Sequence, residues 1–218
     1  MRYKMITGVR SSIIGLLLAF VFVAVEARAE VRMTFWSHDT STYFPHAFIT
    51  LKGTVDSTGE VVDTSYGFTL NSTSPLAIFE SVKAHIDITA KNYIRMSDAQ
   101  FSTLISDEQY AAVKALVMEW GAPGSRWNLE HRNCVHFVAE AARRAGLTVI
   151  EDKKLMKKPR SFTLSLIPLN RNRITVIEMN GREYWSAHPE EEVFDIPDKI
   201  GGSVLGRKIP GLPENRER

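Results

Sequence analysis

The segment that decides the fold is NCVHFVAEAARRAG, residues 133–146. Asn133 is a favoured residue just before a helix and Gly146 a favoured residue just after one, so we predict a helix over 134–145. Helical spacing places Cys134, the only cysteine of the chain, on one face with positions 137, 138, 141 and 145, which are all apolar. That face is expected to pack against a sheet, so Cys134 points inward.

Two predicted strands lie upstream of this helix. In residues 46–53, a series that begins with His46 and Phe48 alternates with an aliphatic series that begins with Ala47. A turn-rich link at 56–59 then leads to a second β-rich run at 61–70. The pattern predicts a hairpin, with a further short strand at 31–37 before it.

The rest of the chain predicts helices and a late hairpin. Ser106 and Gln109 form a capping box that starts a helix ending at Gly121, and Pro159 opens another helix. Further predicted elements are a helix from 74 to about 84, strands at 86–95 and 147–150, and a hairpin of 174–179 and 182–187 turning at Asn180-Gly181. The expected fold class is α+β, with strands first, then helices.

The N-terminus has the pattern of a secretory signal. Basic residues in the first ten positions precede an apolar run at 13–25, and Ala27-Arg28-Ala29 is a small-x-small cleavage pattern. The run is short for a membrane-spanning helix, although an uncleaved anchor is the alternative. We therefore predict a signal peptide at 1–29, one domain at 30–209, a loose tail at 210–218, and a periplasmic or secreted protein with no membrane segment left after cleavage.

Charge gives no reason to expect a nucleic-acid partner. Removing 1–29 takes four basic and one acidic residue from the 27 and 25 of the full chain, which leaves 23 and 24. The mature chain is therefore close to neutral. No metal-ligand spacing and no phosphate-binding glycine motif appear in the sequence, so neither a metal nor a cofactor is expected.

An odd cysteine in an exported chain suggests a reactive thiol, whereas a buried hydrophobic cysteine is the plain alternative. A helix N-terminus lowers a thiol pKa, and its free N–H groups can stabilise an oxyanion. The base must then come from elsewhere in the fold. His136 falls on the opposite side of the helix from Cys134, and His131 lies in a loop, so His46 is the preferred partner. Asp63, Ser65 and Tyr66 on the next strand could orient its ring.

Two segments resemble the NlpC-type papain-like cysteine hydrolases. His46-Ala-Phe-Ile-Thr-Leu-Lys-Gly53 looks like their histidine strand, and Asn133-Cys-Val-His-Phe-Val138 looks like their cysteine helix. The second is most similar to the Asn-Cys-Glu-His-Phe-Val motif of the lecithin:retinol acyltransferase-like branch, with Val135 in place of Glu. That branch is circularly permuted, with the histidine before the cysteine, as here.

The resemblance implies a permuted papain-like fold, an antiparallel sheet packed against a cysteine-bearing helix, and acyl-transfer chemistry. Cys134 would attack a carbonyl, His46 would carry the proton, and Asp63, or alternatively Tyr66, would hold the imidazole. The expected function is an exported thiol hydrolase that cleaves an amide bond in peptidoglycan or periplasmic peptides.

Two alternatives stay open. One is a lipid thioesterase or acyltransferase of the same fold, with Phe35, Trp36, Tyr43 and Phe44 lining an apolar pocket. The other is a catalytically silent binding domain. Residues 148–209 have no assigned role: they either cover the site or extend the core.

Overall fold

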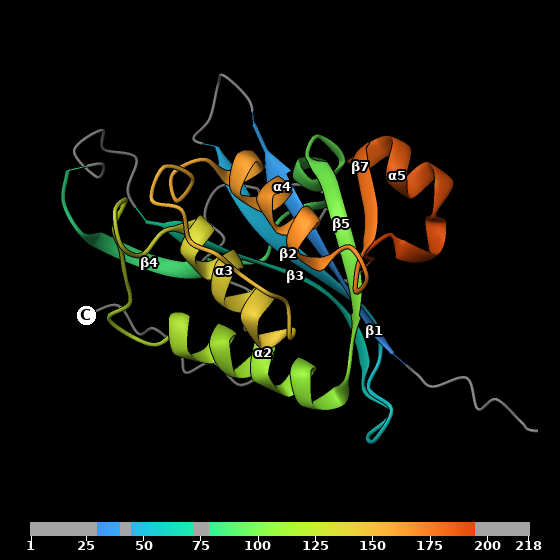
Figure 1. The fold of residues 1–218 in the computed structure, drawn as a ribbon. Helices are drawn as coiled ribbons and strands as arrows, with labels where there is room; N and C mark the ends of the chain where they lie inside the picture. Colours follow the sequence, from blue (N-terminus) through green and yellow to red (C-terminus); the bar gives the residue numbers. More distant parts are fainter. Residues whose placement is uncertain (1–29, 40–44, 72–78, 195–218) are drawn as a thin grey trace, which may run out of the picture.

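The computed structural model describes residues 30–39, 45–71 and 79–194 of the chain. These residues form an α+β fold with a seven-stranded antiparallel sheet and five α-helices (Figure 1). The strands are β1 (Val31–His38), β2 (His46–Thr54), β3 (Val61–Leu70), β4 (Val82–Asp87), β5 (Asp98–Ile105), β6 (Arg126–Trp127) and β7 (Thr175–Asn180). The helices are α1 (Lys91–Arg95), α2 (Asp107–Trp120), α3 (Cys134–Arg144), α4 (Pro159–Asn170) and α5 (Gly181–Ala187), followed by a 3-10 turn at Pro189–Glu191.

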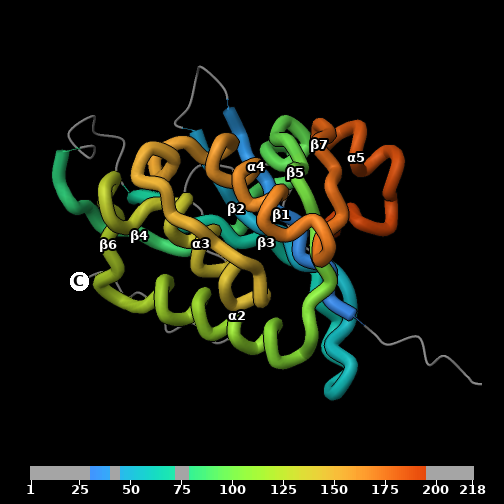
Figure 2. Tube along the Cα trace, in the orientation of Figure 1, coloured from blue at the N-terminus to red at the C-terminus, as the bar shows by residue number. Residues whose placement is uncertain are grey.

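The strand order across the sheet is β6-β4-β3-β2-β1-β5-β7, and Figure 2 shows β4 and β6 at one end and β7 with α5 at the other. The predicted hairpin of β2 and β3 is confirmed, with Lys52 opposite Asp63 and Phe48 opposite Gly67. β2 is the central strand of the seven, with β3 on one side and β1 on the other.

Helices α2, α3 and α4 lie on one side of the sheet (Figure 1). The aliphatic series of β2 belongs to the main core on this side, which also contains the inward face of α3. All five positions predicted for that face are buried: Cys134, Phe137, Val138, Ala141 and Ala145. The aliphatic face of β2 and the apolar face of α3, each predicted from its spacing in the sequence, therefore pack against each other in one core.

A second, smaller core lies on the other side of the sheet. Phe48 packs there with Trp36, Ile94 of α1, and Tyr184 and Trp185 of α5. The rings of Trp36 and Phe48 stack with centroids 6.0 Å apart. Both faces of β2 are thus covered, which explains why almost every side chain from 47 to 51 is fully buried.

Three predicted helix starts are confirmed, two of them by side-chain caps. The Ser106 hydroxyl accepts a hydrogen bond from the Gln109 amide, and the Gln109 side chain accepts one from the Ser106 amide. Helix α4 begins at Pro159, as the sequence predicts. In α3, Asn133 is the N-cap, and Gly146 follows the helix end with a φ of +76°, a conformation that favours glycine.

The hairpin predicted at Asn180-Gly181 is wrong. β7 ends at Asn180, whose side chain accepts a hydrogen bond from the Arg182 amide and so caps α5 instead of turning into a strand. Gly181 is packed so closely against the backbone of Ile94 that a Cβ atom would collide with the Ile94 carbonyl oxygen. Asn180-Gly181 therefore starts a helix here. Position 181 is a glycine because the backbone of Ile94 leaves no room for a Cβ atom.

The segment predicted as a strand over 86–95 divides into two elements. β4 ends at Asp87, and α1 begins after Ala90, which places Ile94 in the second core. Residues 147–150 form no strand. Of the helix predicted from 74 to about 84, residues 74–78 lie outside the described residues. The described part contradicts the prediction, since no residue from 79 to 84 is helical and Val82 begins β4.

The predicted signal peptide at 1–29 and the tail at 210–218 lie outside the described residues, as does the end of the predicted domain. Within the described ranges, no helix is long and apolar enough to cross a membrane.

Candidate active site

Cys134 is the first residue of α3, and the N-cap fixes it firmly. The Asn133 side-chain oxygen accepts hydrogen bonds from the amides of Val135 (2.8 Å) and His136 (3.2 Å). Its amide nitrogen donates to the carbonyls of Leu129 (2.7 Å) and Met156 (2.8 Å). Asn133 is buried, so these four bonds tie the helix start to two loops and hold the thiol in place.

His46 is the first residue of β2, and aromatic side chains surround its ring. It stacks on Phe48 with centroids 5.9 Å apart and meets Tyr93 edge-on at 6.3 Å. Gly67 on β3 makes room for it, because a Cβ atom at Gly67 would lie 2.6 Å from the His46 Nε2 atom. The glycine thus sets the position of the imidazole.

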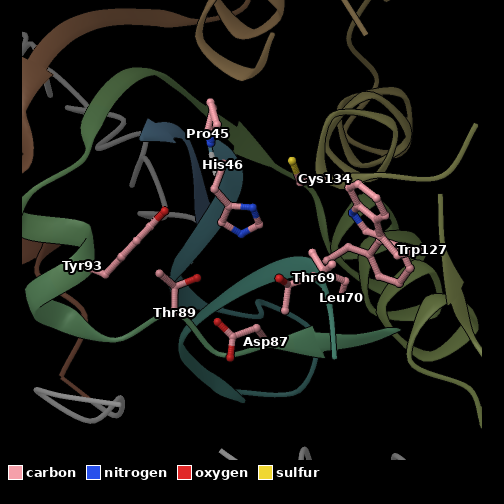
Figure 3. Close-up of a pocket in the computed structure, with 10 residues that line it drawn as sticks. Pro45, His46, Thr69, Leu70, Asp87, Thr89, Tyr93, Trp127 and Cys134 are labelled. Atoms are coloured by element: carbon pink, nitrogen blue, oxygen red, sulfur yellow. The ribbon is translucent and has the colours of Figure 1, made fainter. Parts of the chain in front are cut away.

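Cys134 and His46 line the same pocket, which has a volume of about 210 Å³ (Figure 3). It opens where the paired part of β2 and β3 ends, at Phe48 and Gly67, while β3 continues to pair with β4 as far as Leu70. The described lining residues are Pro45, His46, Phe68, Thr69, Leu70, Asp87, Thr89, Tyr93, Trp127 and Cys134. The predicted pair is therefore brought together at one cavity.

The thiol and the imidazole reach this cavity from opposite faces of the sheet. Cys134 belongs to the main core with Ala47, whereas His46 lies on the same face of β2 as Phe48, which belongs to the second core. Within the described part of the chain, no hydrogen bond joins the thiol to the imidazole. The two groups share a cavity without a hydrogen bond between them in the described residues.

Burial raises the pKa of the Cys134 thiol to about 11. The backbone at Ala47, at Val135 and at Cys134 itself acts in the opposite direction, as N–H groups directed at a sulfur do, but desolvation outweighs it. The start of α3 therefore lowers this pKa as expected, but the net pKa is raised because α3 places the cysteine in the core and not at an exposed helix end.

Burial, with a smaller contribution from the nearby His38, lowers the pKa of His46 to about 4. At neutral pH both groups are uncharged: a thiol and an imidazole. The site at rest is therefore not a thiolate–imidazolium pair.

Asp63 does not lie in the pocket. It is opposite Lys52, six residues along β2 from His46, which corresponds to roughly 20 Å of strand. Its carboxylate accepts hydrogen bonds from Lys52 Nζ at 2.9 Å and from the Phe194 amide at 3.0 Å. The structure therefore contradicts its assignment as the group that orients His46, and its observed role is a cross-strand ion pair.

Tyr66 and Ser65 do not orient His46 either. Tyr66 is opposite Ile49 and packs against the main core, while the Ser65 hydroxyl donates to the Thr89 carbonyl at 3.1 Å. Among the described residues, the His46 ring makes no hydrogen bond. A third member of a Cys-His-polar triad is thus not found in this part of the chain.

The other predicted histidines behave as expected. The His136 ring accepts a hydrogen bond from the Asn133 amide at 3.4 Å and so completes the N-cap, and His131 is exposed. His38 has a closer relation to the site than its sequence context suggested: it is opposite His46 in the β1–β2 register, and its ring centroid is 4.2 Å from that of Tyr93.

Phe35 and Trp36 are not pocket residues. Phe35 stacks on Phe101 with centroids 4.5 Å apart, and the indole N–H of Trp36 donates to the Thr50 hydroxyl at 2.9 Å. Both are fully buried core residues, and positions 43 and 44 lie outside the described residues.

Sequence reasoning missed the other side of the pocket, formed by Asp87, Thr89, Tyr93 and Trp127. These residues come from the end of β4, from α1 and its preceding loop, and from the two-residue strand β6.

Comparisons of the chain with models of protein families, with curated proteins and with solved structures found no match.

Proposed function

We propose that this protein is an exported thiol hydrolase that cleaves an amide bond in peptidoglycan or periplasmic peptides. The observation that carries the proposal is that Cys134, at the start of α3, and His46, at the start of β2, line one cavity. A nucleophile and a base from distant parts of the chain, directed into one cavity, are what covalent acyl transfer requires. The permuted papain-like fold belongs to the same proposal.

In the proposed reaction, the Cys134 sulfur attacks the amide carbonyl carbon while its proton passes to the imidazole of His46. The backbone N–H of Cys134, which the Asn133 cap does not use, stabilises the oxyanion that forms. The intermediate collapses, the imidazolium protonates the leaving amine, and the C–N bond breaks. Water then attacks the thioester, loses its proton to His46, and releases a carboxylic acid and the restored thiol.

The uncharged resting pair constrains the order of these events. With the thiol pKa at about 11 and the imidazole pKa at about 4, proton transfer before substrate binding is strongly unfavourable. The proton therefore moves as the sulfur attacks, when the developing negative charge is on the carbonyl oxygen and not on sulfur.

The pocket favours a peptide over a lipid substrate. A volume of about 210 Å³ is below the range typical of sites that enclose a whole drug-sized ligand, so it accommodates one small group of a larger substrate. Phe35 and Trp36, which would wall a lipid pocket, are instead fully buried in the two cores.

A binding domain without catalytic activity is the second candidate, and one observation favours it. Within the described residues, the imidazole has no orienting hydrogen bond and no hydrogen bond to the thiol. A cavity with an uncharged cysteine and an uncharged histidine also suits a binding role.

Turnover assays separate these candidates. We would incubate the mature chain with peptidoglycan fragments, short peptides and acyl esters, beside Cys134→Ala, His46→Ala and the exposed control His131→Ala. Amide cleavage that is lost in the first two variants and kept in the third supports the proposal. Cleavage of esters alone favours the lipid alternative, and no turnover with any substrate favours a binding domain.

A further inference from the structure

The pocket contains the buried hydroxyl of Thr89. Thr89 is 2% exposed and lines the cavity, yet among the described residues its side-chain oxygen has no hydrogen-bond partner. Its backbone is fixed, since the Thr89 carbonyl accepts the Ser65 hydroxyl. Leaving a buried hydroxyl unpaired is unfavourable, and a ligand that hydrogen-bonds to it would remove that cost.

The carboxylate of Asp87 lines the same cavity. Asp87 is the last residue of β4, pairs through its backbone with Gly67, and lines the pocket with Thr89. In the described part of the chain its side chain makes no hydrogen bond or ion pair. Figure 3 shows both residues below the His46 ring in the view, across the cavity from Pro45.

The charges around the cavity leave this carboxylate unbalanced. Among the described lining residues there is no lysine or arginine, and His46 is uncharged at neutral pH because its pKa is about 4. Burial raises the pKa of Asp87. His85, two residues earlier in β4, lowers that pKa by a smaller amount. Its ring is turned to the Asn71 side chain. A half-buried carboxylate without a cation is costly and attracts one.

We propose that Asp87 and Thr89 form a subsite for an ammonium group, so that the substrate of this pocket is a peptide with a free amino group near the attacked carbonyl. The carboxylate supplies the opposite charge, and both side chains accept N–H hydrogen bonds. The apolar lining residues Phe68, Leu70 and Trp127 then contact the side chain beside that amine. This subsite rests on the proposed function for its link to Cys134, whereas amine binding itself needs no catalysis.

The test measures binding in the Cys134→Ala variant, which cannot turn over substrate. Two probes that differ at one group are alanyl-alanine amide, with a free amine, and its N-acetylated form, titrated at neutral pH by calorimetry or NMR. We expect the free amine to bind at least tenfold more tightly. Adding Asp87→Asn should remove this preference, and adding Thr89→Val should reduce it several-fold.

Asp56→Asn, an exposed substitution of the same type in the β2–β3 link, should leave the preference unchanged. If Asp87→Asn does not fold, Thr89→Val carries the test alone, because valine replaces only the hydroxyl. Equal affinity for the two probes, no binding of either at millimolar concentration, or a preference that persists in both subsite variants would overturn the proposal. Binding of the amine to Cys134→Ala without any turnover by the native chain would support the subsite and reject the hydrolase.

Discussion

Gly67 lies directly against the ring of His46: a Cβ atom there would be 2.6 Å from Nε2. The ring is the movable partner, since β3 is held by its neighbours β2 and β4. Gly67→Ala should therefore displace the imidazole while the sheet stays intact. We expect the rate of amide cleavage to fall at least tenfold and the melting temperature to change little. Unchanged turnover would show that the position of His46 does not matter.

The Cys134 thiol should react slowly with iodoacetamide near neutral pH, contrary to what its place at a helix N-terminus suggests. With a pKa of about 11, the thiolate fraction at pH 7 is on the order of 10⁻⁴, against a few per cent for an unperturbed cysteine. The alkylation rate of the native protein should keep rising from pH 8 to pH 11. A plateau reached below pH 8 would reveal an activated thiolate and contradict the assigned pKa.

His46 should make the protein sensitive to acid. Its folded pKa of about 4 lies below the value of about 6.5 of an unfolded histidine, so between these pH values only the unfolded chain gains the proton. The free energy of unfolding should therefore fall as pH decreases from 6.5 to 4, by about 1–3 kcal/mol after allowance for the partly exposed ring. Urea titrations of the native chain and His46→Gln measure this difference. Parallel pH profiles of the two would refute it.

Asn133→Ala should cost far more stability than an ordinary cap. Asn133 caps α3 and also donates to the Leu129 and Met156 carbonyls from a buried position, so we expect a loss of about 2–4 kcal/mol. Ser106→Ala, at the exposed cap of α2, is the matched control and should cost about 1 kcal/mol. Equal losses, measured by urea unfolding, would mean that the two extra bonds do not tie the helix start to its loops.

The elements with strong local signals were predictable. The capping box at Ser106, the N-cap at Asn133 and the alternation of β2 each depend on residues close together in the sequence, and all are confirmed. Asn180-Gly181 was misread because the same dipeptide suits a hairpin turn and a helix start, and the choice depends on contact with Ile94, far away in the sequence.

The site could be predicted only in part, because it depends on where two paired strands end. Cys134 and His46 follow from a helix start and a strand start. Asp87 and Thr89 join them only because β3 leaves β2 to pair with β4, a long-range choice without a local pattern. The prediction that Asp63 orients His46 is wrong because it rests on strand order alone. Strand order shows that β2 and β3 are neighbours, but not that Asp63 lies opposite Lys52, far along β2 from His46.

Cys134 should carry an acyl group during amide cleavage. Rapid quenching of the mature chain with a cleavable peptide, followed by intact mass spectrometry and peptide mapping, tests it directly. We expect an adduct with the mass of the acyl fragment on Cys134, which is absent from Cys134→Ala and accumulates less in His46→Ala. Cleavage without any adduct, or cleavage that persists in Cys134→Ala, would contradict it.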